Sequence, residues 1–133
     1  MNNKKLIFLG GTCNGSLWRN ELIPNLKINY FNPVVENWTP ECQEAEIAYR
    51  ETCDFCLYVI TPKMTGIYSI AEAVDDSNKR PEKTLFCFLE KDDTCEFTTH
   101  QLKSLKQTSK MIISNGGKVF NSLQDVAAYC DKN

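Results

Sequence analysis

Short apolar runs alternate along this chain with stretches in which apolar residues recur at helical spacing. The runs lack strict polar alternation, which is typical of strands that are buried on both faces of a parallel sheet. Gly10-Gly11 ends the first run and Thr61-Pro62 ends a later one, so turn-forming residues stand where a strand should stop. The predicted strands are Leu6–Leu9, a segment within Ile28–Val35, Asp54–Ile60, Thr84–Leu89 and Lys110–Ser114.

Helices are predicted between these strands. Apolar residues within Gly66–Asp76 recur at i, i+3, i+4 and i+7, which is the spacing of one helix face. Thr39-Pro40-Glu41 combines a capping threonine with a proline at the first helical position, so a helix should begin there and run to about Thr52. The other predicted helices are Leu17–Leu26 with Ser16 as its N-cap, a segment near Thr98–Gln107, and Leu123–Asp131 with Ser122 as its N-cap.

The alternation of strands and helices predicts an α/β fold. A chain of 133 residues suits one domain, so residues 1–133 are expected to form a single open parallel five-stranded sheet with helices on both faces, either flavodoxin-like or Rossmann-like. In such sheets ligands bind beyond the carboxyl ends of the strands, where the strand order reverses. The loops that follow Leu9, Asn32, Ile60 and Leu89 are therefore the places to look for a site.

Charge and hydropathy narrow the possible partners. Lysine plus arginine is 15 and aspartate plus glutamate is 17, giving a net charge of −2. No basic surplus is present to bind a phosphate backbone, so a nucleic-acid polymer is not an expected partner. The longest apolar stretches, such as Leu6–Leu9 and Leu57–Ile60, are too short to span a bilayer or to form the apolar region of a signal peptide. We expect a cytoplasmic protein without a membrane partner.

Seven cysteines, an odd number, form no repeated spacing, which favours reduced thiols. Cys53 and Cys56 match a C-x-x-C pattern, but residues three apart in an extended strand point to opposite faces. No second Cys/His pair accompanies them, so a metal site is not expected. His100 is the sole histidine and lies far along the chain from the glycine-rich loop, which weakens any serine- or cysteine-based triad.

Two features could carry chemistry. The loop Gly10–Ser16 could let a ligand approach the backbone, or its glycines could serve turn geometry alone. Glu72 lies in the predicted helix after the third strand, one turn from Tyr68 and Ser69. Most helix glutamates are exposed, but this helix starts beneath the expected ligand site, so its carboxylate could face the crevice.

Two tryptophans could contact a ligand. Trp18 and Trp38 could each stack on a planar ring or cover the sheet as packed aromatics. Trp38 is the better pocket candidate because its loop follows the second predicted strand and reaches the same edge of the sheet as Glu72.

At this point the order of motifs resembles a known family. Phe8-Leu9-Gly10-Gly11-Thr12, Trp18-Arg19, Tyr30-Phe31-Asn32-Pro33-Val34-Val35 and Thr65-Gly66-Ile67-Tyr68-Ser69-Ile70-Ala71-Glu72 follow one another along the chain. Over roughly residues 5 to 90 this resembles the nucleoside 2-deoxyribosyltransferase-like family. The resemblance implies that Glu72, between small residues, is a nucleophile that takes the deoxyribose from its base. It also implies a further acid in the preceding helix, for which Glu46 is the candidate and Glu44 an alternative.

The resemblance implies substrates that are 2-deoxynucleosides or their monophosphates, no metal or organic cofactor, and a homodimer or larger homo-oligomer. The same scaffold could instead serve as a non-catalytic nucleotide-binding or sensing module, since a fold does not fix a function. Cleavage of an NAD-type nucleotide is a third hypothesis. The substrate-binding candidates are Gly10, Gly11, Thr12, Trp18, Asn32, Trp38, Glu46, Thr65, Tyr68 and Ser69.

Overall fold

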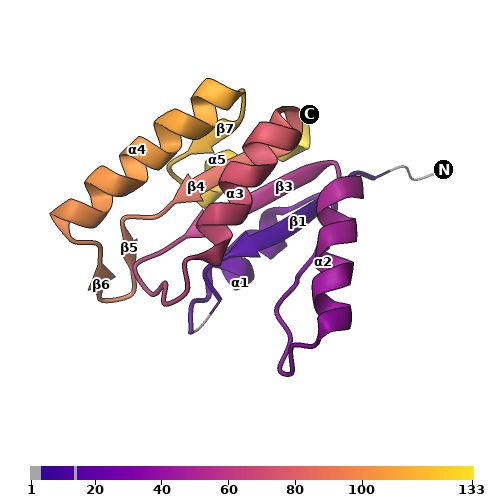
Figure 1. Cartoon of the computed structure of the whole chain (residues 1–133), viewed down its shortest axis with the longest axis horizontal. Coiled ribbons are helices and arrows are strands. Elements are labelled where there is room, and N and C mark those ends of the chain that lie inside the picture. Colours follow the sequence, from indigo (N-terminus) through magenta and orange to yellow (C-terminus); the bar gives the residue numbers. More distant parts are fainter. Residues whose placement is uncertain (1–3, 14) are drawn as a thin grey trace.

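A five-stranded, wholly parallel sheet forms the centre of the computed structural model, which describes residues 4–13 and 15–133 (Figure 1). Asn14 of the predicted glycine-rich loop lies outside the described residues. The strand order is β2-β1-β3-β4-β7, which is the flavodoxin-like order. The α/β prediction is therefore confirmed. The strands are β1 Leu6–Gly11, β2 Asn29–Phe31, β3 Phe55–Ile60, β4 Thr84–Phe88 and β7 Lys118–Phe120.

Helices cover both faces of this sheet. In Figure 1, α2, α3 and α4 lie in front of the strands, whereas α1 and α5 lie behind them. Within the described part of the chain, no helix combines the length and apolar character that crossing a bilayer requires. The remaining elements are α1 Trp18–Leu22, the 3-10 turn η1 Ile23–Asn25, α2 Pro40–Thr52, α3 Tyr68–Lys79, the 3-10 turn η2 Pro81–Lys83, the short hairpin β5 Lys91–Asp92 and β6 Cys95–Glu96, α4 Thr99–Asn115 and α5 Leu123–Lys132.

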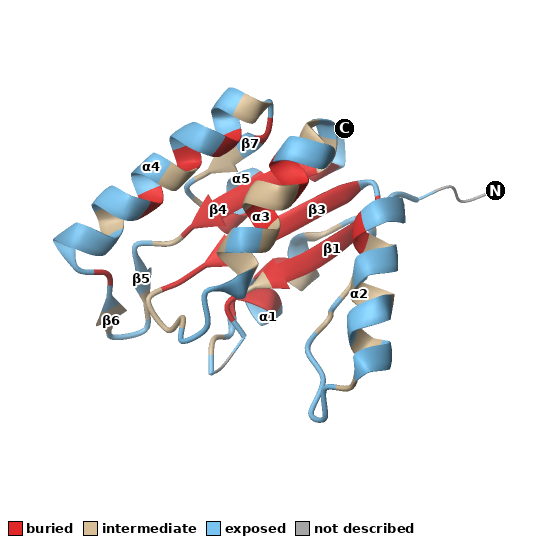
Figure 2. Ribbon diagram, viewed as in Figure 1, coloured by how far each residue is buried: buried red, intermediate tan, exposed pale blue. Residues whose placement is uncertain are grey.

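The core consists of two apolar layers, one on each face of the sheet. Every residue of β3 and β4 is buried, as expected for central strands that are covered on both sides (Figure 2). Leu57 of β3 packs in the layer formed with α1 and α5, and Tyr58 packs in the layer formed with α3 and α4. On that second face, Tyr49 of α2 stacks on Phe31 of β2 with ring centroids 3.8 Å apart. This stack holds α2 beside the edge of the sheet.

Helix starts were predicted with mixed success. The Thr39 hydroxyl accepts a hydrogen bond from the Cys42 amide at 3.3 Å, and the Ser122 hydroxyl accepts one from the Asp125 amide at 3.1 Å, so both predicted caps are confirmed. The prediction of Ser16 as a cap is wrong. Leu17 occupies the cap position of α1 and offers no side-chain bond. The Ser16 hydroxyl instead donates to Asp92 at 2.6 Å, which ties the loop after β1 to the β5–β6 hairpin.

The predicted strand Lys110–Ser114 is also wrong. These residues continue α4, and the fifth strand is β7, a few residues further on. Within the segment Ile112 is fully buried whereas Ile113 is 57% exposed, a helical pattern that continues the buried side of Leu105. A glycine ends the helix: Gly116 adopts the left-handed conformation, with φ at 106°, as helix C-caps often do. Ile112 and Ile113 suit a strand, but burial of one helical face decides the structure here.

The prediction that Cys53 and Cys56 point to opposite faces is wrong as well. Their sulfur atoms lie 3.2 Å apart in the core. Cys53 is the C-cap residue of α2, and β3 begins only at Phe55, so the chain turns between the two cysteines instead of running straight.

The two ends of the described chain meet at one edge of the sheet. Lys5, which precedes β1, donates a hydrogen bond from its ammonium group to the carbonyl oxygen of Asn133, which follows α5. This edge carries the amino ends of the strands, opposite the edge to which their carboxyl ends point.

Candidate active site

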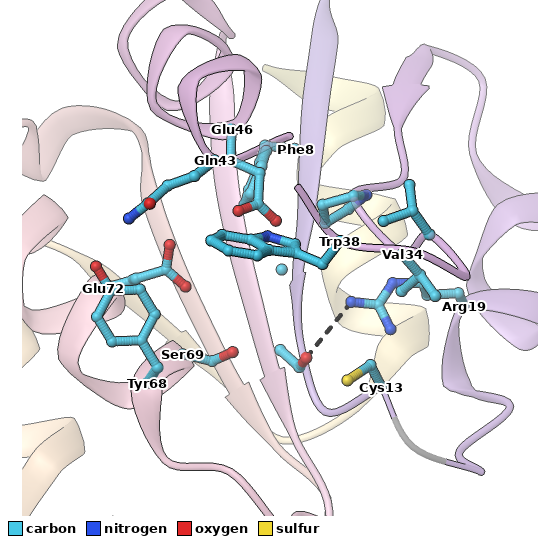
Figure 3. A pocket seen from close by; sticks show the side chains of 14 residues that line it. Phe8, Cys13, Arg19, Val34, Trp38, Gln43, Glu46, Tyr68, Ser69 and Glu72 are labelled. Carbon is cyan, nitrogen blue, oxygen red and sulfur yellow. Dashed lines mark hydrogen bonds between the residues drawn. The ribbon is translucent and has the colours of Figure 1, made fainter. Parts of the chain in front are cut away.

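A pocket of about 390 Å³ opens beyond the carboxyl ends of β1 and β3 (Figure 3). These two strands flank the point at which the strand order reverses, which is where open parallel sheets bind ligands. The pocket volume falls within the range of small-molecule sites, roughly 300–1,000 Å³. Its walls come from β1 and the loop after it, from the loop before α2, and from α2 and α3.

Glycines form part of the pocket wall because nothing larger fits there. A Cβ atom at Gly10 would lie 2.8 Å from the ring of Tyr58. Gly11 has φ at 121°, and a Cβ atom there would overlap the backbone of Val59 in β3. Packing of β1 against β3 therefore requires both glycines. Contact of these glycines with a ligand stays a prediction.

Glu72 lies in the second turn of α3 and lines the pocket. Only 13% of its side chain is exposed, and Figure 3 shows the carboxylate directed inward, toward the indole of Trp38. Tyr68 and Ser69, one turn earlier on the same helix, line the same pocket. The interpretation of Glu72 as an ordinary surface residue is therefore excluded, whereas its role as a nucleophile stays a prediction.

The opposite wall is α2, which contributes Glu46 and Gln43. Glu44, the alternative to Glu46, is exposed and does not line the pocket. Trp38 precedes α2 and lies across the pocket between the two walls, with 57% of the residue still exposed (Figure 3). Its side chain also lowers the pKa of Glu46. The loop before α2 and the helix itself therefore bring an aromatic face and a carboxylate to one place.

The pocket perturbs both carboxylates. Burial raises the pKa of Glu72 to about 7; the charges of Glu46, Asp76 and Asp75 act in the same direction, and that of Arg50 opposes them. Burial also raises the pKa of Glu46, while the neighbouring Trp38 side chain and the charge of Arg50 act against this. A pair of carboxyl groups with raised pKa values can hold a proton near neutral pH, which is the condition for acid–base chemistry.

The structure places four of the predicted contact residues elsewhere. Trp18 is buried in the core and donates from its indole to the carbonyl oxygen of Thr12 at 2.7 Å. Asn32 accepts a bond from the Val34 amide at 3.1 Å and so shapes the turn after β2. Thr12 and Thr65 line a second hollow of about 250 Å³, which shares part of its wall with the first. Thr12 also joins the two site loops, because its hydroxyl oxygen accepts a bond from the Thr61 amide at 3.0 Å.

Two arginines near the pocket were not predicted. Arg19 lines the pocket and donates to the carbonyl oxygens of Leu9 and Thr12 at 2.8 Å. Burial lowers its pKa to about 10, while the charge of Cys13 acts in the opposite direction. Arg50 of α2 contacts Glu72 from within the protein, at 3.4 Å. Arg19 stands beside Trp18 in a motif of the family resemblance and so had a signal in the sequence, whereas nothing comparable distinguished Arg50.

The arrangement can support substitution at an electrophilic carbon. A carboxylate, a second carboxyl group and an aromatic face converge on one pocket. No group of three or more histidine, cysteine, aspartate or glutamate side chains placed to hold a metal ion occurs among residues 4–13 and 15–133. The chemistry supported by these side chains is nucleophilic attack by a carboxylate, assisted by proton transfer.

One comparison with known proteins gives a result. A family model described as nucleoside 2-deoxyribosyltransferase like matches residues 4–91, which include both walls of the pocket. No curated protein and no solved structure matches the chain.

Proposed function

Because the chain belongs to the nucleoside 2-deoxyribosyltransferase-like family, we propose that it cleaves or transfers at the N-glycosidic bond of a 2-deoxynucleoside or its monophosphate, with Glu72 as the nucleophile. The observation that carries this proposal is the Glu72 carboxylate, which is largely withdrawn from solvent yet directed into the pocket. Burial of a charged group is costly, so a largely buried acid that lines a pocket and has a raised pKa is a candidate for a functional group.

The reaction proceeds in two displacements. In the first, an oxygen of ionised Glu72 bonds to the anomeric carbon while the bond from that carbon to the base breaks, and the electron pair leaves with the base. The reacting carbon is oxocarbenium-like, so a carboxylate both stabilises its charge and bonds to it. In the second, water or another base attacks the same carbon and gives a proton to the second carboxyl group of the pocket, Glu46, while the electron pair of the ester bond returns to Glu72. Water gives hydrolysis, and a second base gives transfer.

Glu46 is the proposed proton donor to the departing base. A base leaves more readily when a ring nitrogen is protonated, so an acid should stand near it. Burial raises the pKa of Glu46, which favours the protonated form that this role needs. The exposed indole of Trp38, which lines the same pocket as Glu46, offers a surface on which the base can stack.

Product analysis tests this proposal. Purine and pyrimidine 2-deoxynucleosides, their 5′-monophosphates and an NAD-type dinucleotide are incubated with the protein, with and without a second base, and free base is measured by chromatography. We expect base release from a 2-deoxynucleoside or its monophosphate, and a loss of about a thousandfold or more in Glu72→Gln. Glu44→Gln is the matched control, because Glu44 is exposed and outside the pocket.

Other outcomes lead to different conclusions. Base release that survives in Glu72→Gln would remove Glu72 from its role. Binding without any release after long incubation would favour the alternative, a nucleotide-binding or sensing module. Acid quenching followed by peptide mass spectrometry gives a direct check, since the ester intermediate should add the mass of the sugar to the peptide that contains Glu72.

We also propose that the protein works as a homodimer or larger homo-oligomer. Apolar residues at the pocket are exposed in the single chain: Val34, Val35, Trp38 and Tyr68 are each at least 47% exposed. A second copy that covered them would remove apolar surface from water next to the site. Light scattering after size exclusion measures the mass, and a monomer at all concentrations tested would contradict this proposal.

A further inference from the structure

Arg50 lies in the last turn of α2 and reaches across to α3, where it meets three carboxylates. Its Nη1 lies 3.4 Å from Oε2 of Glu72, and its Nη2 lies 3.2 Å from Oδ2 of Asp75. Nε and Nη2 donate to the two carboxylate oxygens of Asp76 at 3.2 and 3.1 Å. Only 9% of the Arg50 side chain is exposed. A cation that is sheltered from solvent therefore contacts the carboxylate of Glu72.

The position of Arg50 is set by partners other than Glu72. Asp76 is completely buried and binds the guanidinium through both of its oxygens, a geometry that fixes orientation as well as distance. Asp76 in turn accepts a hydrogen bond from the Tyr58 hydroxyl and another from Arg80, each at 2.5 Å. Tyr58 belongs to the central strand β3 and is fully buried. The guanidinium is thus anchored to the sheet through Asp76 and Tyr58.

We propose that Arg50 is a positioning residue for Glu72: anchored by Asp76, its guanidinium holds one oxygen of the Glu72 carboxylate and keeps that group ionised and directed into the pocket. This inference rests on the proposed function and assigns a residue that acts through Glu72 without touching the substrate. The family match does not by itself indicate such a contact, because it arises where the Arg50 side chain reaches from α2 to the carboxylates of α3.

The charges around Glu72 explain why a cation is needed. Glu46 faces it from α2, and Asp75 and Asp76 face it from its own helix. Burial and these three carboxylates raise the pKa of Glu72, and Arg50 is the group that lowers it. A nucleophilic carboxylate must be ionised before it attacks. Loss of Arg50 would therefore leave most Glu72 carboxyl groups protonated at neutral pH.

The same contact affects the second displacement. When the ester bond breaks, negative charge returns to the Glu72 carboxylate, and the guanidinium lies beside one of its oxygens to stabilise that charge. Arg50 contacts Glu72 but is not among the residues that line the pocket. Replacing Arg50 should therefore lower kcat and leave KM little changed.

The test compares three variants of the full-length protein. Arg50→Gln removes the positive charge. Arg50→Lys keeps the charge but loses the paired nitrogens that bind both oxygens of Asp76. Arg80→Gln is the matched control. Arg80 also binds Asp76, but no contact between it and Glu72 is seen among the described residues. The Glu72 carboxyl carbon is titrated by NMR after ¹³C labelling, with Glu72→Gln to assign its signal. This readout needs no substrate, so it remains informative if the proposed function fails.

We expect Arg50→Gln to raise the pKa of Glu72 by about one to three pH units, while Arg80→Gln changes it far less. If Arg50→Gln does not fold, Arg50→Lys decides the question, with a smaller rise in the same direction. In an active protein, the acidic limb of the plot of kcat against pH should move to higher pH with KM nearly constant, and kcat at pH 7 should fall about fivefold or more.

Two results would overturn the inference. One is a Glu72 pKa that moves equally in the Arg50 and Arg80 variants, which would assign the effect to Asp76 alone. The other is a Glu72 pKa that stays unchanged in whichever Arg50 variants fold. A shifted Glu72 pKa together with no base release from any substrate would uphold the role of Arg50 and reject the proposed function. Base release together with an unchanged pKa of Glu72 in the Arg50 variants would uphold the proposed function and reject the role of Arg50.

Discussion

Replacing Glu72 by glutamine should stabilise this protein at alkaline pH while it abolishes turnover. The substitution keeps the shape of the side chain and removes its charge. Burial raises the pKa of Glu72 from 4.5 to about 7, so the folded state favours the protonated acid. Below about pH 4.5 the acid is protonated in the folded and unfolded chains alike. As pH rises toward 7 the unfolded chain loses this proton first, and the folded state becomes relatively less stable.

The size of this effect follows from the two pKa values. A difference of one pH unit corresponds to about 1.4 kcal/mol, so the rise from 4.5 to about 7 corresponds to roughly 3 kcal/mol once the pH exceeds the folded pKa. Part of that loss has already occurred by pH 5. Between pH 5 and pH 8, wild type should therefore lose roughly 2 to 3 kcal/mol relative to Glu72→Gln. Because 13% of the side chain is exposed, solvent screening will reduce this value only modestly.

Urea unfolding at pH 5 and pH 8, followed by far-ultraviolet circular dichroism, measures the effect by linear extrapolation. The informative quantity is the change with pH of the stability difference between wild type and Glu72→Gln, since groups that titrate alike in both proteins cancel. Glu44→Gln is the control, and its stability difference should stay within about 0.5 kcal/mol of zero at both pH values. An equal difference at pH 5 and pH 8, or a variant that is less stable than wild type at pH 8, would refute the assignment of a raised pKa to Glu72.

Three further predictions concern stability and binding. Tyr58→Phe removes a hydrogen bond to the buried carboxylate of Asp76 and should lower the free energy of unfolding by about 1 to 3 kcal/mol, measured by urea unfolding at pH 7. Gly11→Ala should destabilise far more than Gly15→Ala: both glycines have positive φ, but only a Cβ at Gly11 meets the backbone of β3, and equal melting temperatures would contradict this. Trp38→Ala should weaken ligand binding about tenfold by calorimetry with unchanged circular dichroism, and unaltered affinity would exclude stacking.

Local signals in the sequence were enough to predict most of the fold. Thr39-Pro40 and Ser122 begin helices because their side chains satisfy amide groups that a helix leaves unpaired, and such signals need only a few neighbouring residues. The prediction of a strand at Lys110–Ser114 was wrong because its two isoleucines suit a strand locally. The residues against which Ile112 packs in the helix belong to distant parts of the chain. Gly116-Gly117, the stop signal for α4, was present in the sequence but was not used.

The site was predicted as far as it depends on strand order. Glu72 and Trp38 follow strands whose carboxyl ends share an edge, whereas Glu46 was implied only by the family resemblance; the structure brings all three to one pocket. Arg50 could not be predicted in the same way. Its contact with Glu72 depends on where α2 lies relative to α3, and no local pattern in the sequence sets that position. Trp38 was favoured over Trp18 as a ligand contact because of the loop that carries it, but the sequence did not show that Trp18 is buried in the core.

The meeting of Lys5 with Asn133 has a practical consequence. Both lie at the amino ends of the strands, whereas the pocket lies beyond the carboxyl ends. An affinity tag, a fluorescent reporter or a surface tether attached at either end would leave ligand entry open. A circularly permuted chain that joins these ends through a short linker, with new ends opened in a surface loop, should keep the arrangement of α2 and α3 on which the pocket depends.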